Sequence, residues 1–180
     1  MRVISGSLRG LKLDTLSGMD TRPTLDRVKE ALFSMLFDRT YDAVGLDLFA
    51  GSGALGIELL SRLGKECTFV DINPDAIKVI GSNIKKARLE DRAFVKRQSF
   101  SEFLKTTDKK FDIIFMDPPY EMGLYDDALS IIYQRGLLSF NGVIVLECKS
   151  DYEVNPGNFT IIKDKTYGKV RLCVLEMHTK

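Results

Sequence analysis

The sequence lacks any long apolar run, and its first residues, MRVISGSLRG, lack the apolar stretch of a signal peptide. A helix needs about 20 mostly apolar residues to cross a bilayer. A secretory leader needs an apolar segment behind its basic start. We therefore expect a cytoplasmic protein that makes no contact with a membrane.

Cysteine and histidine, which are common metal ligands, are also scarce. Cys67, Cys148 and Cys173 are the only cysteines, each lies among apolar neighbours, and none is within metal-ligand spacing of another. The single histidine, His178, follows the last apolar pattern of the chain. We expect three reduced thiols in the core, no metal, and no chemistry at His178.

Neither sign of charge is in large excess, because the formal net charge is +1. Its distribution is uneven, since residues 78–110 hold ten Lys or Arg against four acids, and residues 1–29 hold six against three. Such a local excess is typical of a solvated face or of a nucleic-acid contact. Charge alone does not decide between these two interpretations.

With 180 residues, 44% of them hydrophobic, the chain is expected to form a single domain. Residues 1–40 read as an extension ahead of the main pattern. Two short apolar stretches around Gly6 and Gly10 predict a hairpin in the first fifteen residues. A helical face follows, made of Val28, Ala31, Leu32, Met35 and Leu36. A monomer is expected, because the chain has no long heptad pattern.

From residue 44 the pattern alternates between strands and helices. Strands are expected at residues 44–50, 67–72, 93–97, 111–116 and 142–148, and helices at 54–64, 73–87, after Ser99 and at 124–134. Asn73 and Pro74 are typical of a helix start, and Ser99 with Glu102 forms a capping box. Residues 159–167 and 169–177 read as a final antiparallel hairpin. This alternation predicts an α/β fold with a mostly parallel, doubly wound sheet.

A glycine loop, DLFAGSGALGIE, lies between the first strand and the first helix of this pattern, with Asp71 twenty residues after Gly51. Gly51, Gly53 and Gly56 match the spacing of a dinucleotide-binding loop. Asp47, at the end of the strand, would repel a pyrophosphate and attract the cationic sulfonium and amino group of S-adenosylmethionine. Asp71 suits the ribose hydroxyls of either cofactor. The loop therefore favours S-adenosylmethionine.

The stretch Asp117-Pro118-Pro119-Tyr120 ends the strand FDIIFM. Asp117 and the carbonyl of Pro118 would accept the two N–H bonds of an exocyclic amino group and favour its pyramidal transition state. Pro119 would keep that carbonyl rigid, and the ring of Tyr120 would stack on the base. A turn would account for the two prolines but not for the acid and the tyrosine, whereas amino-group methylation gives all four residues a role.

The combination of DLFAGSGALGIE with DPPY is similar to the amino-group methyltransferases of DNA and RNA. The N-terminal RVISGSLRGLKL and TRPTLDRVKEALFSML, with Arg22-Pro23-Thr24, resemble the RsmD family, which methylates the guanine N2 amino group in 16S ribosomal RNA. The resemblance covers nearly the whole chain. It implies a seven-stranded, Rossmann-like methyltransferase sheet with helices on both faces, a catalytic core at 41–180, and RNA of the small ribosomal subunit or its assembly intermediates as partner.

The candidate site is therefore assigned as follows. The catalytic residues are Asp117, Pro118, Pro119 and Tyr120; the cofactor-binding residues are Asp47, Phe49, Ala50, Gly51, Ser52, Gly53, Asp71, Ile72, Ser99 and Phe100; the RNA-binding residues are Arg2, Arg9, Arg22, Arg27 and Lys29. Many relatives have an acid after the third strand against the adenine amino group, where this chain has Gln98-Ser99-Phe100, so the adenine contact stays open.

Two other functions remain compatible with these residues. An adenine-N6 methyltransferase of DNA or RNA would use the same four residues for the same chemistry. DNA enzymes of this kind need a separate domain to find and flip their base, and this chain has only some forty extra residues. A non-catalytic or dinucleotide-binding domain is the third alternative, although it gives Tyr120 no use.

Overall fold

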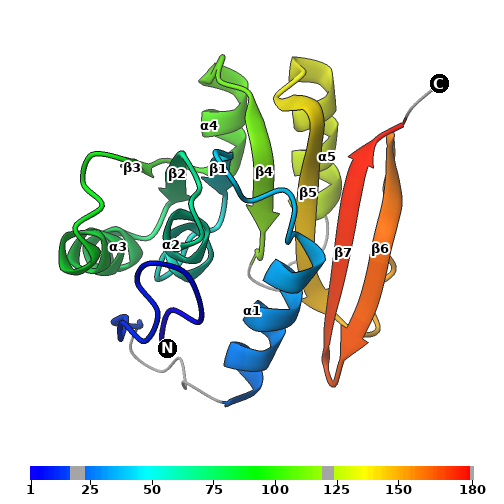
Figure 1. The fold of residues 1–180 in the computed structure, drawn as a ribbon. Helices are drawn as coiled ribbons and strands as arrows, with labels where there is room; N and C mark the ends of the chain where they lie inside the picture. Colours follow the sequence, from blue (N-terminus) through cyan, green and yellow to red (C-terminus); the bar gives the residue numbers. More distant parts are fainter. Residues whose placement is uncertain (17–22, 119–123, 179–180) are drawn as a thin grey trace.

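The computed structural model describes residues 1–16, 23–118 and 124–178 as a three-layer α/β domain (Figure 1). A seven-stranded sheet forms the middle layer, in the order β3-β2-β1-β4-β5-β7-β6. The strands are β1 (Val44–Asp47), β2 (Glu66–Asp71), β3 (Ala93–Arg97), β4 (Phe111–Met116), β5 (Leu138–Lys149), β6 (Phe159–Tyr167) and β7 (Val170–Met177). The first five strands pair in parallel, and β7 is antiparallel to both β5 and β6. The predicted fold class is confirmed.

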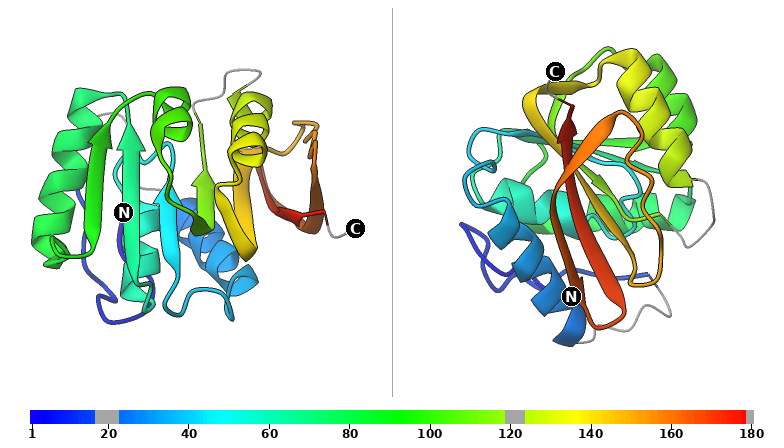
Figure 2. Two further views of the ribbon diagram at one scale, coloured as in Figure 1. Left: turned by 90° about the horizontal axis from the view of Figure 1, so that it is seen from above. Right: turned by 90° about the vertical axis from the view of Figure 1, so that its right-hand side faces the viewer.

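Helices cover both faces of the sheet. They are α1 (Pro23–Met35), α2 (Ala54–Ser61), α3 (Pro74–Ala87), α4 (Phe100–Thr106) and α5 (Leu124–Arg135). Figure 2 shows α1 on one side of the sheet and α4 and α5 on the other. None of these described helices is long and apolar enough to cross a membrane.

Strand β4 shows why the central strands are continuous apolar runs. Ile113 and Phe115 pack with Phe33 of α1 on one face of the sheet. Ile114 and Met116 pack with the side chains of α5 on the other face. Both faces of a parallel sheet are covered by helices, so every position of FDIIFM except Asp112 is buried.

The predicted helix caps are confirmed. The side chain of Asn73 accepts a hydrogen bond from the amide of Asp75, and Pro74 begins α3. The hydroxyl of Ser99 accepts a hydrogen bond from the amide of Glu102 at the start of α4. Both caps follow from local sequence, because each satisfies an amide that has no partner within its helix.

The N-terminal hairpin pairs in an antiparallel manner, as expected, but only through an isolated bridge between Arg2 and Lys12. Two of its amides bond outside the hairpin, since those of Ile4 and Ser5 donate to the two carboxylate oxygens of Glu58 at 2.8 and 3.0 Å. Glu58 lies in α2 and has no exposed surface. The hairpin is therefore fixed to α2 by a side chain rather than by a strand ladder.

Glu58 also binds two cations. The ammonium of Lys29 in α1 lies 3.2 Å from one carboxylate oxygen, and Nε of Arg62 lies 2.9 Å from the other. Burial lowers the pKa of Lys29, and the charge of Glu58 opposes that shift. One buried carboxylate thus joins the hairpin, α1 and α2.

We predict that Glu58→Ala lowers the free energy of unfolding by roughly 3–5 kcal/mol, because the buried charge of Lys29 loses its paired carboxylate and two amides lose their acceptor. Denaturant unfolding followed by circular dichroism measures the change. Glu90→Ala, at an exposed acid after α3, is the control and should stay within about 0.5 kcal/mol of wild type. Equal effects of the two variants would contradict the role given to Glu58.

Candidate active site

Four acidic residues lie at the carboxyl ends of four parallel strands. Asp47 and Asp71 end β1 and β2, Asp117 follows β4, and Glu147 is near the end of β5. Parallel strands bring their carboxyl ends to the same edge of a sheet, which is where open α/β sheets bind ligands. This edge contains the sequence-predicted catalytic and cofactor-binding residues that the structure describes.

The glycine loop between β1 and α2 takes the backbone form that its glycines allow. Gly51 and Gly53 have φ values of 54° and 77°, in the left-handed region that favours glycine. Gly56 meets a different need, because a Cβ there would lie 2.3 Å from the ring of Phe69 on β2. Two glycines therefore shape the turn, and the third lets α2 approach the sheet.

Asp47 holds this loop in place. Its side chain is buried, and Oδ2 accepts a hydrogen bond of 3.0 Å from the amide of Gly56. Desolvation, assisted by the nearby charges of Asp117 and Asp71, raises the pKa of Asp47 to about 7. From its place in the sequence Asp47 is expected only to contact the cofactor; in the structure it also positions the first turn of α2.

Asp71 supports the other side of the loop. Oδ2 accepts from the amide of Gly51 and Oδ1 from the amide of Asn73, both at 2.8 Å. Each carboxylate oxygen can accept a second hydrogen bond, and the side chain is half-buried. Ile72, the next residue, is 67% exposed and offers an apolar surface beside this carboxylate.

The residues after β3 give a mixed result. Ser99 uses its hydroxyl to cap α4, so the cap explains its presence without a ligand. The ring of Phe100 packs on Phe49, with 5.3 Å between the ring centres, and both side chains stay half-buried. An aromatic pair, rather than an acid, therefore follows β1 and β3 at this edge.

Asp117 and Glu147 are neighbours across β4 and β5. The residues just before them, Met116 and Leu146, are paired in the sheet. Water reaches Asp117, yet the protein around it desolvates the carboxyl enough to raise its pKa. Desolvation and the charge of Asp117 also raise the pKa of Glu147. Glu147 was not among the residues predicted from the sequence, although an acid near the end of the apolar strand GVIVLEC is a signal for it.

Three predicted residues, Arg22, Pro119 and Tyr120, lie outside the described part of the chain. Pro118 is described and is buried. The other cofactor-loop residues, Ala50 and Ser52, are buried beside the glycines, and the carbonyl of Ser52 accepts from Asn83 at 2.9 Å.

The predicted RNA-binding residues divide into two groups. Arg2, Arg9 and Arg27 are exposed, and Nε of Arg2 forms an ion pair with Asp26 at 2.9 Å. Lys29 is only 5% exposed and is paired with Glu58. The prediction that Lys29 contacts RNA is therefore corrected, because an ammonium held in the interior cannot reach a phosphate.

Known proteins resemble this chain over almost its full length. The model of the family described as "Conserved hypothetical protein 95" matches residues 1–176. Ribosomal RNA small subunit methyltransferase D of Haemophilus influenzae is 37% identical over 174 residues, covering 94% of this chain and 90% of that protein. The Escherichia coli protein of the same name is 32% identical over 172 residues, covering 94% of this chain and 86% of that protein. The solved Escherichia coli structure yhhF superposes with a TM-score of 0.89 at 31% identity, covering 100% of this chain and 99% of that chain.

We predict that Asp47→Asn changes how stability depends on pH. The folded pKa of about 7 lies above the ordinary value near 4, so the folded state keeps a proton that the unfolded state has released. The free energy of unfolding of the wild type should therefore fall by up to roughly 4 kcal/mol as the pH rises from about 4 to about 7, and this contribution should then stay constant.

Asp47→Asn removes this titration and keeps an oxygen that accepts from Gly56. Urea unfolding of both proteins at several pH values between 4 and 8 measures the difference. Asp151→Asn, at an exposed acid, is the control and should follow the wild-type curve. Parallel curves for wild type and Asp47→Asn would contradict the prediction.

Proposed function

This chain belongs to the RsmD family, whose model matches residues 1–176, and on that premise we propose that it transfers a methyl group from S-adenosylmethionine to the N2 amino group of a guanine in 16S ribosomal RNA. The observation that carries the proposal is the position of Asp117. It follows β4, which pairs with β1, so it lies at the edge of the sheet where the glycine loop begins. An acceptor for an amino group is thus next to a loop of the form that binds adenosine cofactors.

The residues at this edge fit S-adenosylmethionine, which supplies a methyl group made electrophilic by its sulfonium. Free lone pairs on the carboxylate of Asp71 suit ribose hydroxyls, and the exposed side chain of Ile72 suits the adenine ring. Burial raises the pKa values of Asp47 and Glu147, so a cationic ligand, which stabilises their ionised forms, suits this edge better than a pyrophosphate. The aromatic pair Phe49 and Phe100 is proposed to give the adenine an apolar neighbour. The amino group of the adenine is proposed to bond to backbone groups, because no acid follows β3.

Asp117 and the carbonyl of Pro118 are proposed to accept the two N–H bonds of the target amino group. The lone pair of this nitrogen is delocalised into the base, and acceptors on both hydrogens favour the pyramidal form that attacks the methyl group. The raised pKa of Asp117 makes its carboxylate a better proton acceptor than an ordinary aspartate. Pro119 and Tyr120 are proposed to fix the carbonyl and to stack on the base.

The substrate is proposed to be the RNA of small ribosomal subunits or of their assembly intermediates, which implies a cytoplasmic location. The described residues form the α/β fold that carries the candidate site, so a folded RNA that displays one base is proposed to supply the selection. Exposed Arg2, Arg9 and Arg27, with Arg22, are proposed to contact its phosphates, and the enzyme is proposed to act as a monomer.

We predict that Asp71→Ala weakens S-adenosylmethionine binding by roughly 1.5–3 kcal/mol, the contribution of a charge-assisted hydrogen bond. Gly53→Val should also block binding, because a side chain at φ 77° is strained and its Cβ would lie 3.3 Å from Phe69. Calorimetric titration measures both variants, with Asp75→Ala as the control on the first turn of α3. NAD is the second titrant, and affinity for NAD instead of S-adenosylmethionine would contradict the assigned cofactor.

The product of the reaction tests the proposed function. Small subunits that lack the modification should accept a labelled methyl group, and nuclease digestion followed by mass spectrometry should find it in N2-methylguanosine. Asp117→Ala should bind the cofactor normally and lose turnover, by roughly 100-fold or more for the loss of a transition-state acceptor. Label in N6-methyladenosine or in duplex DNA would favour the adenine enzyme, and wild-type turnover by Asp117→Ala would exclude the proposed pocket.

A further inference from the structure

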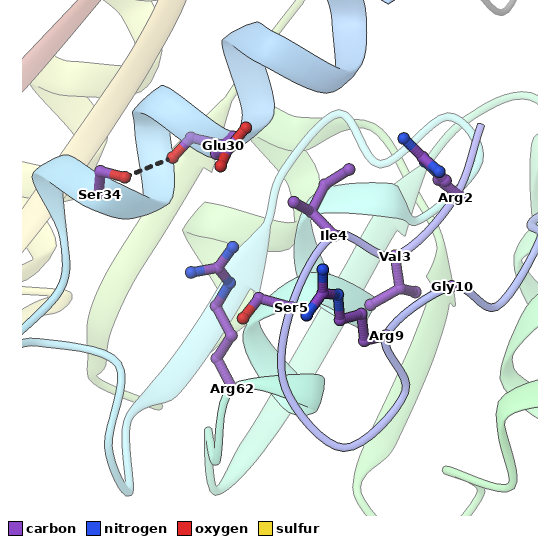
Figure 3. Close-up of a pocket in the computed structure, with 9 residues that line it drawn as sticks. All are labelled: Arg2, Val3, Ile4, Ser5, Arg9, Gly10, Glu30, Ser34 and Arg62. Carbon is purple, nitrogen blue, oxygen red and sulfur yellow. Dashed lines mark hydrogen bonds between the residues drawn. The ribbon is translucent and has the colours of Figure 1, made fainter.

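A cavity of about 420 Å³ lies on the face of the protein that carries the N-terminal hairpin (Figure 3). The hairpin forms one wall, α1 forms another, and the end of α2 closes the third side. Three guanidinium groups, from Arg2, Arg9 and Arg62, line it together with one carboxylate, from Glu30. This excess of positive charge differs from the acidic edge that holds the candidate active site.

Arg62 is held rigidly on the wall of this cavity. Its Nε donates to Glu58 at 2.9 Å, and its guanidinium carbon lies 4.8 Å from the centre of the Phe33 ring. The side chain is only 17% exposed. In the described part of the chain no hydrogen bond or ion pair uses its two terminal nitrogens. The plane of Arg62 is therefore fixed while its outer edge remains available to a ligand.

Arg9 faces the same space from the hairpin. Figure 3 shows its guanidinium close to Ser5, on the side of the hairpin that faces Arg62. The side chain is exposed, and it makes no ion pair with any described residue. Arg2 differs, because its pair with Asp26 satisfies part of its charge. Arg9 is thus the cavity arginine without a described ion pair, and Arg62 is the one whose guanidinium plane is fixed.

We propose that this cavity binds a phosphodiester group of the RNA substrate between Arg62 and Arg9, at a site separate from the target base. A planar guanidinium presents paired N–H donors that match two phosphate oxygens, and a guanidinium whose plane is already fixed loses little freedom on binding. The volume is sufficient for a nucleotide as well as its phosphate. This inference rests on the proposed RNA substrate and adds a specific site to it.

The position of the cavity relates it to the active site through α2. The glycine loop, beside which the target base is proposed to lie, precedes this helix, and Arg62 caps its end. Arg62 is therefore separated from the loop by the length of eight helical residues, about 12 Å. Successive phosphates in a stacked strand are about 3.4 Å apart along the axis. The bound phosphate would therefore lie a few nucleotides from the methylated base, and it would set the register of the RNA.

Three variants that each remove one positive charge test the site: Arg9→Gln, Arg62→Gln and, as control, Lys165→Gln at an exposed position on β6 at the other edge of the sheet. The affinity for purified 16S ribosomal RNA is measured at several salt concentrations. Each lost phosphate contact should make the salt slope less steep by about 0.7–0.9. We expect this change for both arginine variants and a wild-type slope for Lys165→Gln. Affinity for S-adenosylmethionine should be unchanged in all three.

Arg9→Gln separates loss of the site from misfolding, because the side chain of Arg9 makes no hydrogen bond or ion pair in the described part of the chain. If either arginine variant keeps the salt slope of Lys165→Gln, the phosphate site is wrong. If micromolar inorganic phosphate binds wild type but not the arginine variants, and leaves the affinity for RNA unchanged, the site belongs to the free ion and the RNA assignment is overturned.

Methylation of small subunits is measured in parallel and separates the two proposals. A wild-type chain that binds RNA through both arginines but labels no subunit would overturn the proposed function alone. Normal methylation with unaltered salt slopes in both variants would overturn the phosphate site alone.

Discussion

The buried carboxylate of Glu58 is the interaction on which the arrangement of this protein depends. It accepts hydrogen bonds from two hairpin amides, pairs with Lys29 of α1 and orients Arg62 at the end of α2. A buried charge is stable only when such partners surround it. The N-terminal segment has almost no strand ladder of its own, so Glu58, with the hydrogen bonds of Ser61 to the hairpin, helps to fix the hairpin and α1 against the catalytic core.

Helix α2 connects the parts of the protein that act. Its first turn is held by Asp47 and carries the glycine loop, its middle carries Glu58, and its cap residue is Arg62. A helix is stiff over eight residues, so the cofactor loop and the arginine cavity keep a fixed separation. The proposed cofactor site and the proposed phosphate site would then both be positioned by this one rigid helix.

Charge is separated across the surface although the net charge is only +1. Four carboxyl groups gather at the carboxyl edge of the sheet, where a cationic cofactor is proposed, and three arginines line the cavity beside the hairpin, where a phosphate is proposed. A cationic cofactor would stabilise the ionised carboxyls and a phosphate would pair with the arginines, so the two substrates would bind at different places. The even balance of charge in the sequence conceals this division.

The sequence by itself determined the elements whose causes are local. Alternating strands and helices, the caps at Asn73 and Ser99, and the glycine loop followed from spacing and residue type, and each is confirmed. Asp117 was found for a similar reason, because an acid before a double proline at a strand end is visible in the chain. Only the tertiary structure decided which charged side chains are buried or paired when their partners are distant in the sequence. In the folded chain Lys29 is buried against Glu58, and Asp47 accepts a hydrogen bond from the amide of Gly56. Glu147 lies beside Asp117, and Arg62 lines a cavity together with Arg9. An ionisable side chain has the same letter in the sequence whether water or a counter-charge surrounds it. Only the fold determines which of these two environments the side chain has.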